Sequence, residues 1–452
     1  MPGPETIRDY LDTVTAQIRW KRARAAAVRE LETHLEDQRQ EFQTEGHPPE
    51  EAERLAVEEM GDPVAVGTDL DRLHRPRPQW GMLAVTLALL LVGSYLRYAL
   101  TRVGEPWYDL DPFRCALSAA AGAAALMGAY FLDVSRLLYR ARWVYMGAIA
   151  AGVLCLLFSP NVNNASYFTR YIVLLYPAVY ALWLYDCRGK GWRGLLAAVA
   201  GGLPLTLICL AAPFMQGMVL LLVIGCFLLL LAIWMDWFTV PRRQGLAAVG
   251  GLAAIMAGAV LWLLFAAGYN SARIQALLHP ETDPMGSGYQ SIMARWVLEA
   301  SRLVGKGKDL SIQTVTLQGG ELPMEMMLPE WNHDFFPTTM VYKLGWLPYL
   351  LLMAVLAALL LWILRRCACQ RSQSGKLLAL AVVGTLAVQS AFAVVLNLGF
   401  VLFSAQLPLV TGNLHSVADC ALIGLALSAF RSESILRDTA MPVFQAPQKE
   451  TA

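Results

Sequence analysis

Apolar residues form ten long runs in the part of the chain that follows Trp80. Each run has about the twenty residues that an α-helix needs to cross the hydrocarbon core of a bilayer. The predicted spans are 81–100, 113–132, 142–159, 168–185, 194–213, 217–236, 246–268, 339–364, 377–403 and 407–430. The pattern therefore predicts an all-α, polytopic membrane protein with about ten transmembrane helices.

The first 75 residues have a different pattern, in which apolar positions recur at helical spacing between charged ones. One helix is expected from Thr6 to about Glu45, a second from Glu50, and a short third one after Pro63. The expected organisation is a three-helix cytoplasmic domain at 1–75, a linker at 76–80, a transmembrane domain at 81–431 and a cytoplasmic tail at 432–452.

Composition agrees with a small polar domain joined to a membrane domain. The chain is 56% hydrophobic and 16% charged, whereas soluble domains have about 25% charged residues. Residues 1–78 hold 11 Lys/Arg and 17 Asp/Glu, which is 28 of the 71 charged residues. The net charge of +1 says nothing about nucleic acid, because the charge is unevenly spread along the chain, and no nucleic-acid partner is expected. Cys367 and Cys369 are too closely spaced for a zinc site, and no metal site is predicted.

Basic residues mark alternate loops between the runs, and such loops face the cytoplasm. They are Arg136, Arg140, Arg142, Arg188, Lys190, Arg193, Arg242, Arg243, Arg365, Arg366, Arg371 and Lys376. The alternation requires an even number of spans. Both termini are therefore predicted to be cytoplasmic, and the long hydrophilic loop 269–338 is predicted to be extracellular.

Charges in this long loop are sorted by position. Residues 295–308 contain the cations Arg295, Arg302, Lys306 and Lys308 with one anion, and residues 309–334 contain five anions and no cation. An amphipathic helix is expected within 287–304. It either lies in the membrane interface with its arginines extended towards the head groups, or its cations receive a lipid diphosphate.

Asp334 lies directly before the eighth run, among aromatic and apolar residues. One interpretation is an N-cap for a helix that begins near Pro337. The other is a general base, because partial desolvation at the membrane edge would raise its pKa into a useful range. The residues alone leave both interpretations open.

The N-terminal domain resembles the permease prefix domain, on the basis of Glu50-Glu-Ala52 after Gly46 and of Glu58-Glu-Met-Gly-Asp-Pro63. That resemblance implies an appended regulatory or docking bundle. Most of residues 80–430 resemble the SEDS family of RodA/FtsW/SpoVE-type proteins. The matching segments are Arg273-Ile274, Asp283-Pro-Met-Gly-Ser-Gly-Tyr-Gln290, Gly305-Lys-Gly307, Leu328-Pro-Glu-Trp-Asn-His-Asp-Phe335, Lys343-Leu-Gly345, Asn397-Leu-Gly399 and Leu407-Pro-Leu-Val-Thr-Gly412.

The SEDS resemblance implies a peptidoglycan glycosyltransferase in the bacterial plasma membrane that polymerises lipid II for cell shape, division or sporulation. Asp334 takes the place of the family's catalytic acid, as the base for an inverting transfer in which undecaprenyl diphosphate leaves. A transpeptidase of the penicillin-binding class is the implied partner, no cofactor is identified, and a divalent cation stays open. The implied substrate-binding residues are Arg295, Arg302, Lys306, Lys308, Tyr289, Gln290, Glu330, His333, Asn397 and Thr411.

The chain also departs from the family pattern. The family's His-Thr before the aspartate reads Asn332-His333, and its Pro- and Gly-rich segment after Thr-Gly is replaced by Asn413-Leu-His-Ser-Val-Ala-Asp-Cys420. One alternative is therefore a catalytically degenerate regulator or scaffold, for which Asp334 is dispensable. Another is a lipid or solute transporter, which needs polar residues facing a midplane cavity. The polar residues available in the spans are Thr206, Thr385, Gln389, Ser390 and Asn397.

Overall fold

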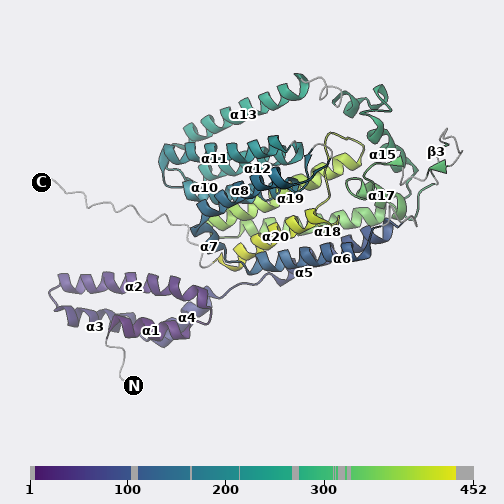
Figure 1. The fold of residues 1–452 in the computed structure, drawn as a ribbon. Helices are drawn as coiled ribbons and strands as arrows, with labels where there is room; N and C mark the ends of the chain where they lie inside the picture. The colour runs from purple at the N-terminus through teal and green to yellow at the C-terminus, as the bar shows by residue number, and fades with distance from the viewer. Residues whose placement is uncertain are drawn as a thin grey trace. The chain divides into compact units, whose positions relative to one another are not determined.

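The computed structural model describes residues 6–102, 110–162, 165–212, 214–266, 274–308, 310, 312–313, 321–322 and 327–433. Arg273, one of the residues that carry the SEDS resemblance, lies outside them. Packing divides the chain into two units (Figure 1). The N-terminal unit comprises the residues up to Pro78 and a short stretch after Ala429, and the membrane unit runs from Gln79 to Ala429.

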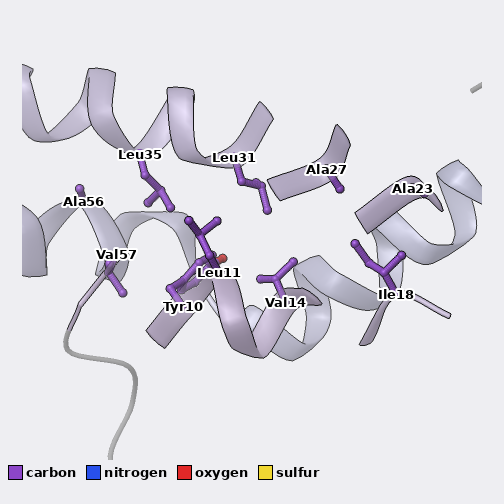
Figure 2. Packing of buried hydrophobic residues seen from close by; sticks show 10 residues of the cluster. All are labelled: Tyr10, Leu11, Val14, Ile18, Ala23, Ala27, Leu31, Leu35, Ala56 and Val57. Atoms are coloured by element: carbon purple, nitrogen blue, oxygen red, sulfur yellow. The ribbon is translucent and has the colours of Figure 1, made fainter. Parts of the chain in front are cut away.

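The N-terminal unit is a small helical bundle with its own core. Its helices are α1 (Ile7–Gln17), α2 (Lys21–Thr44), α3 (Pro49–Met60) and α4 (Pro63–His74). Helix α1 packs against α2 and α4, and α2 packs against α3. Apolar side chains at helical spacing, including Tyr10, Val14 and Leu35, meet in the buried cluster shown in Figure 2.

The expected number of three helices is wrong, because the first expected helix is divided into α1 and α2. The backbone is extended at Ile18, whose side chain is fully buried in the core. The freed amide of Arg19 donates to Oδ1 of Asp71 at 2.8 Å. A contact with a residue far along the chain therefore ends α1, and local helical periodicity does not reveal it.

The membrane unit contains eight described helices that are long and apolar enough to cross a bilayer. They are α5 (Trp80–Leu100), α6 (Pro112–Phe131), α8 (Ala141–Phe158), α11 (Gly191–Ala211), α12 (Met215–Trp234), α18 (Trp346–Ala368), α19 (Gln373–Asn397) and α20 (Leu414–Arg431). A further long helix, α13 (Arg242–Ala266), occupies the position of the seventh expected span. The predicted all-α polytopic membrane fold is confirmed.

Shorter elements complete this unit. They are α7 (Val134–Tyr139), α9 (Thr169–Val173), α10 (Tyr176–Cys187), the 3₁₀ turn η1 (Pro280–Thr282), α15 (Tyr289–Ala300) and α17 (Phe336–Leu344). Four two-residue strands form two antiparallel pairs among the described residues. Strand β1 (Asn161–Val162) pairs with β2 (Ala165–Ser166), and β3 (Ile312–Gln313) pairs with β4 (Glu321–Leu322). Helix α19 packs against α10, α12 and α18, and α15, α17 and β3 gather at one end of the unit (Figure 1).

Two expected spans are broken rather than continuous. The fourth is divided into α9 and α10, whose second residue is Pro177, and proline has no amide hydrogen to continue a helix. The eighth is divided into α17 and α18 at Gly345, which has φ = +101°. A Cβ there would lie 2.6 Å from the carbonyl oxygen of Leu303, so only glycine fits where the two backbones pass.

The predicted limits of the last two spans are also wrong. Helix α19 ends at Asn397 and α20 begins at Leu414, which leaves residues 398–413 without helical structure. Pro408 falls within this segment, and Gly399 and Gly412 have positive φ values of 85° and 56°. Non-helical backbone is tolerated inside a membrane protein where protein buries it, and the stretch from Ala405 to Thr411 is buried.

Close approach of α5 to this segment gives a first prediction. A Cβ on Gly93 would lie 2.5 Å from Cα of Val410 and 2.7 Å from its carbonyl oxygen. Gly93→Ala should therefore destabilise the fold by about 1–3 kcal/mol and lower the thermal unfolding midpoint in detergent. Gly147→Ala in α8 is the matched control, because nothing lies within 4 Å of the added Cβ. Equal midpoints for the two variants would show that the segment is not packed tightly on α5.

Candidate active site

Asp334 lies in a compact turn, residues 328–335, immediately before α17. The amides of His333 and Phe335 both donate to the carbonyl of Glu330, whose φ of 56° lets the chain turn back. Leu328, Trp331 and Phe335 are buried in one cluster with Ala294 of α15. The apolar residues around Asp334 thus anchor the turn, and the aspartate is held on a packed surface.

The Asp334 side chain is 9% exposed and accepts a hydrogen bond at Oδ1 from Nε2 of Gln406, at 3.1 Å. Burial raises the pKa of Asp334 to about 6, while hydrogen bonds from Ser404 and Gln406 and the charge of Arg170 oppose the increase. Helix α17 receives no side-chain cap, and its N-cap position is Phe335. The N-cap interpretation of Asp334 is therefore wrong.

Asn397, at the end of α19, fixes the backbone of the turn. Its Nδ2 donates to the carbonyl oxygen of Asp334 at 3.0 Å, and its Oδ1 accepts from the amide and hydroxyl of Thr338 at 2.9 and 2.7 Å. Asn397 is 4% exposed. This predicted site residue therefore positions Asp334 through the main chain.

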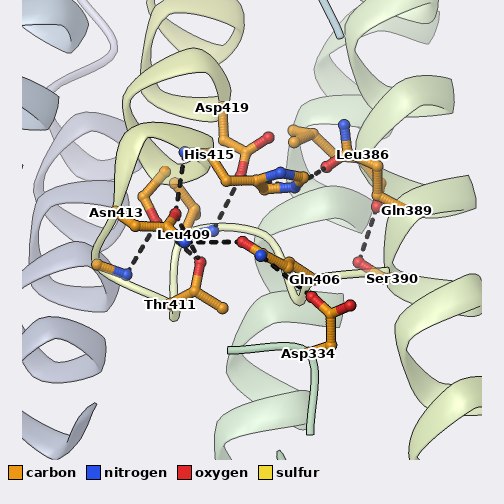
Figure 3. Close-up of polar contacts among 12 residues, drawn as sticks. Asp334, Leu386, Gln389, Ser390, Gln406, Leu409, Thr411, Asn413, His415 and Asp419 are labelled. Atoms are coloured by element: carbon orange, nitrogen blue, oxygen red, sulfur yellow. Dashed lines mark hydrogen bonds and ion pairs between the residues drawn. The ribbon is translucent and has the colours of Figure 1, made fainter. Parts of the chain in front are cut away.

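The non-helical segment 398–413 supplies the polar groups beside the carboxylate (Figure 3). Gln406 donates to Asp334 and accepts at Oε1 from Nδ2 of Asn413, at 2.8 Å. The hydroxyl of Thr411 donates to Oδ1 of Asn413 at 3.2 Å. The predicted residue Thr411 thus lies in this network, whereas Gln406 and Asn413 were not predicted as site residues.

Arg97 of α5 was also not predicted, although it is the most extensively bonded charge beside the turn. It is 4% exposed. Its guanidinium donates to the carbonyl oxygens of Asn332 and Gly412 at 2.9 and 3.3 Å, and lies 3.1 Å from Nδ1 of His333. Arg97 therefore connects the turn to the 398–413 segment. Burial, together with the charges of Arg97 and Arg170, lowers the pKa of His333 to about 4, so its imidazole is neutral at pH 7.

Arg170 of α9 is a second cation that sequence reasoning missed. Its charge acts on both His333 and Asp334, and its buried Nε has no hydrogen-bond partner among the residues that the structure describes. The signal was present in the sequence, because Arg97 and Arg170 both fall inside predicted spans, where a charge is costly and commonly functional.

Of the other predicted residues of the loop, Glu330 lies in the same turn and its charge acts on the Asp334 carboxylate. Arg302, Lys306 and Lys308 are exposed on a segment whose backbone pairs with residues 342–347. Arg295 is half-buried, with its guanidinium 5.0 Å from the ring of Phe400. Gln290 is half-buried and Glu330 is exposed, while the hydroxyl of Tyr289 donates to the carbonyl of Met327 at 2.8 Å.

The amphipathic helix is present as α15, and its inner face packs on protein. Ala294 lies in the cluster that holds the Asp334 turn, and Val297 and Ala300 pack against Tyr342 of α17. Val297 and Ala300 of the expected apolar face therefore pack on protein, and the location of this helix in the membrane interface stays a prediction. Helix α15 instead supports the turn.

Two further polar residues are buried behind the site, on α20. Nε2 of His415 lies 3.3 Å from Oε1 of Gln389 and 3.9 Å from Oδ2 of Asp419, and that oxygen accepts from the amide of Leu409 at 3.2 Å. Leu409 has φ = 65°, so Asp419 holds a turn that a leucine rarely adopts. Within the described ranges, no three His, Cys, Asp or Glu side chains gather to hold a metal ion.

The site thus combines a buried carboxyl whose pKa is raised to about 6 with the buried Arg97, the half-buried Arg170 and a neutral histidine. A carboxyl with such a pKa can accept a proton at pH 7, and fixed cations stabilise anionic groups that develop beside it. Carried by a bundle of membrane-spanning helices, this arrangement defines a polytopic membrane protein with an acid–base site at one end of its bundle.

Comparison with known proteins gives the family. The sequence model of the FtsW/RodA/SpoVE family, described as "Cell cycle protein", matches residues 78–433. The chain therefore belongs to the FtsW/RodA/SpoVE family, also known as SEDS. The fold agrees with two solved structures. One, from a peptidoglycan synthase complex that coordinates polymerization and crosslinking, has a TM-score of 0.59 at 19% identity, over 79% of this chain and 98% of that one.

The other is the rod shape determining protein RodA of Thermus thermophilus, with a TM-score of 0.51 at 17% identity, over 79% of this chain and 97% of that one. Among curated relatives, the peptidoglycan glycosyltransferase MrdB of Escherichia coli K12 is 32% identical over 36% of this chain and 40% of its own. A probable peptidoglycan glycosyltransferase FtsW of Idiomarina loihiensis is 30% identical over 27% and 29%. The matched regions thus cover less than half of these relatives.

Proposed function

We propose that this protein is a peptidoglycan glycosyltransferase that polymerises lipid II into glycan strands. The observation that carries the proposal is the Asp334 carboxyl, which is buried, held by Gln406 and has a pKa of about 6. Family membership and the names of the relatives MrdB and FtsW support the same reaction class.

In the proposed reaction, Asp334 acts as general base. Its carboxylate takes the proton from the 4-hydroxyl of the acceptor sugar while that oxygen attacks the anomeric carbon of the donor. The bond to the donor's diphosphate breaks, and undecaprenyl diphosphate leaves with inversion at the anomeric carbon. Arg170, which acts electrostatically on Asp334, would stabilise the charge that develops on the leaving group.

We further propose that the exposed cations Arg302, Lys306 and Lys308 attract the diphosphate lipid before it reaches the site. Tyr289, Gln290, Arg295 and Glu330 are then candidates for contacts with the sugars or the peptide. The proposed setting is the bacterial plasma membrane, with both termini cytoplasmic and the loop 269–338 outside. A transpeptidase partner fits, because the structural neighbour comes from a complex that couples polymerization and crosslinking.

The N-terminal unit has a separate proposed role. It has its own buried core, and its sequence resembles the permease prefix domain. We propose that it is a cytoplasmic regulatory or docking module without chemistry of its own.

The test is polymerisation of lipid II by the purified full-length protein, analysed as glycan chain length on gels. Wild type is expected to make strands, either alone or with a candidate transpeptidase added. If neither preparation makes strands, the glycosyltransferase proposal fails, and a regulatory role in wall synthesis becomes the better interpretation of the family fold.

A further inference from the structure

Two side-chain amides connect the start of helix α20 to the Asp334 carboxylate. Oδ1 of Asn413 accepts from the amide of His415 at 2.9 Å, so Asn413 is the N-cap of α20. Nδ2 of Asn413 donates to Oε1 of Gln406 at 2.8 Å, and Nε2 of Gln406 donates to Oδ1 of Asp334 at 3.1 Å. Figure 3 shows these contacts in one chain.

The hydrogen bonds in this series cannot be reversed, because the groups at its two ends, the His415 amide and the Asp334 carboxylate, fix the direction of donation. A backbone amide can only donate, so Asn413 must present its oxygen to His415 and its nitrogen to Gln406. Gln406 must then present its oxygen to Asn413, which turns its nitrogen towards Asp334. The amide orientations are thus set by the helix start, whose backbone amides carry partial positive charge.

The surroundings keep this arrangement rigid. Gln406 is 7% exposed. The hydroxyl of Thr411 adds a second donor to Oδ1 of Asn413. Leu409 lies between Gln406 and Asn413 in the sequence, and the carboxylate of Asp419 accepts from its amide and holds the turn there.

We propose that Gln406 and Asn413 are positioning residues that pass the polarity of the α20 N-terminus to Asp334 and hold it as an oriented, ionised base. This inference rests on the proposed function of Asp334 and adds the groups that prepare it. Neither amide exchanges a proton with substrate in this scheme. Their part is to favour the carboxylate over the carboxylic acid.

The charges that face Asp334 come from two other places. Glu330, on the same turn, raises the pKa of Asp334, and Arg170 of α9 lowers it. Tyr171 of α9 is also close enough to interact electrostatically with Asp334. The hydroxyl of Ser404 contributes a hydrogen bond that acts in the same direction as that of Gln406. Gln406 is itself oriented by the hydrogen bond that it accepts from Asn413.

Removal of the Gln406 amide should move the pH profile of polymerisation. A base works only when deprotonated, so its activity falls as pH drops through its pKa. In Gln406→Leu the carboxylate loses a donor, and the acidic limb should move to higher pH by about one to two pH units. Asn413→Ser keeps a cap for α20, but the hydroxyl of the shorter side chain is not expected to reach Oε1 of Gln406, so a smaller move in the same direction is expected.

Two comparisons separate the effect of the hydrogen bonds from Asn413 through Gln406 to Asp334, here called the relay, from general damage to the fold. Ser390→Ala is the matched control, because Ser390 belongs to the same group of polar residues in Figure 3 and donates within its own helix, to the carbonyl of Leu386. The double variant Gln406→Leu with Asn413→Ser should move the limb no further than Gln406→Leu alone, since both changes act through one contact.

A second measurement does not depend on catalysis. The C=O stretching band of protonated Asp334 can be assigned in infrared spectra by its loss in Asp334→Asn, and its titration midpoint followed in each variant. If the titration midpoint of Asp334 is raised in Gln406→Leu while wild type does not polymerise lipid II, the relay is supported and the proposed function is rejected. An unchanged midpoint and an unchanged acidic limb in Gln406→Leu would reject the relay, as would an equal shift in Ser390→Ala or fully additive shifts in the double variant.

Discussion

Asp334→Asn is expected to reduce the rate of lipid II polymerisation by about 100-fold or more, because general bases contribute 10²–10⁴ to such reactions. Asparagine has nearly the same shape and can still accept the hydrogen bond that Gln406 donates at 3.1 Å. It cannot accept a proton from the acceptor hydroxyl. The measurement is the initial rate of strand formation by purified protein at pH 7.5.

Glu281→Gln is the control for loss of a carboxylate in the same loop. The Glu281 side chain is 71% exposed and lies on η1, away from the Asp334 turn. Its polymerisation rate should equal that of wild type. Full activity in Asp334→Asn would show that the base is a different residue, even if the protein polymerises lipid II.

Asp334→Asn should be at least as stable as wild type. A lower polymerisation rate in this variant would then reflect lost chemistry and not unfolding. The pKa of Asp334 is about 6 in the folded state and 3.8 for an unperturbed aspartate. Ionising it in the folded protein therefore costs about 3 kcal/mol. Because the folded pKa is raised, this cost is complete above pH 6 and disappears as pH falls towards 4. Asp334→Asn should unfold at a higher temperature than wild type at pH 7.5, and the gain should shrink at acidic pH.

Arg97→Met should produce the largest loss of stability, about 3 kcal/mol or more, because it removes every hydrogen bond that this buried guanidinium makes. The carbonyl oxygens of Asn332 and Gly412 both accept from this guanidinium, and that of Gly412 also accepts from the hydroxyl of Ser118 at 2.6 Å. They belong to the turn and to the 398–413 segment, which Arg97 connects. A methionine fills the volume but supplies no donor, and the thermal unfolding midpoint in detergent should fall accordingly.

Arg97→Lys tests whether charge alone is sufficient. A lysine carries the same charge, but its single ammonium lacks the planar fork that reaches separate acceptors, so it should restore only part of the loss. Arg102→Met, which removes an exposed arginine just beyond the end of α5, should leave the midpoint close to that of wild type. A similar decrease in Arg102→Met would mean that the positive charge itself, and not the three contacts, stabilises the fold.

The sequence alone determined the membrane class of this protein and most of its helices. Hydrocarbon requires every backbone polar group to be bonded within its own helix, so runs of about twenty apolar residues have few other outcomes. The runs at 81–100 and 113–132 correspond to α5 and α6, and no limit differs by more than one residue. Motif order in the long loop and its flanks was sufficient to indicate the family and to select Asp334.

Only the tertiary structure decided how the site is built. Arg97 and Gln406 reach the Asp334 turn from far along the chain, and Asn413 contacts Gln406. No local periodicity encodes the contacts with the turn. The breaks at Ile18 and Gly345 likewise depend on what another segment places beside them. The pKa of Asp334 is a property of the same packing, because burial is its largest cause. A helical pattern specifies which residues share one face, whereas the chemistry of this site depends on which faces meet.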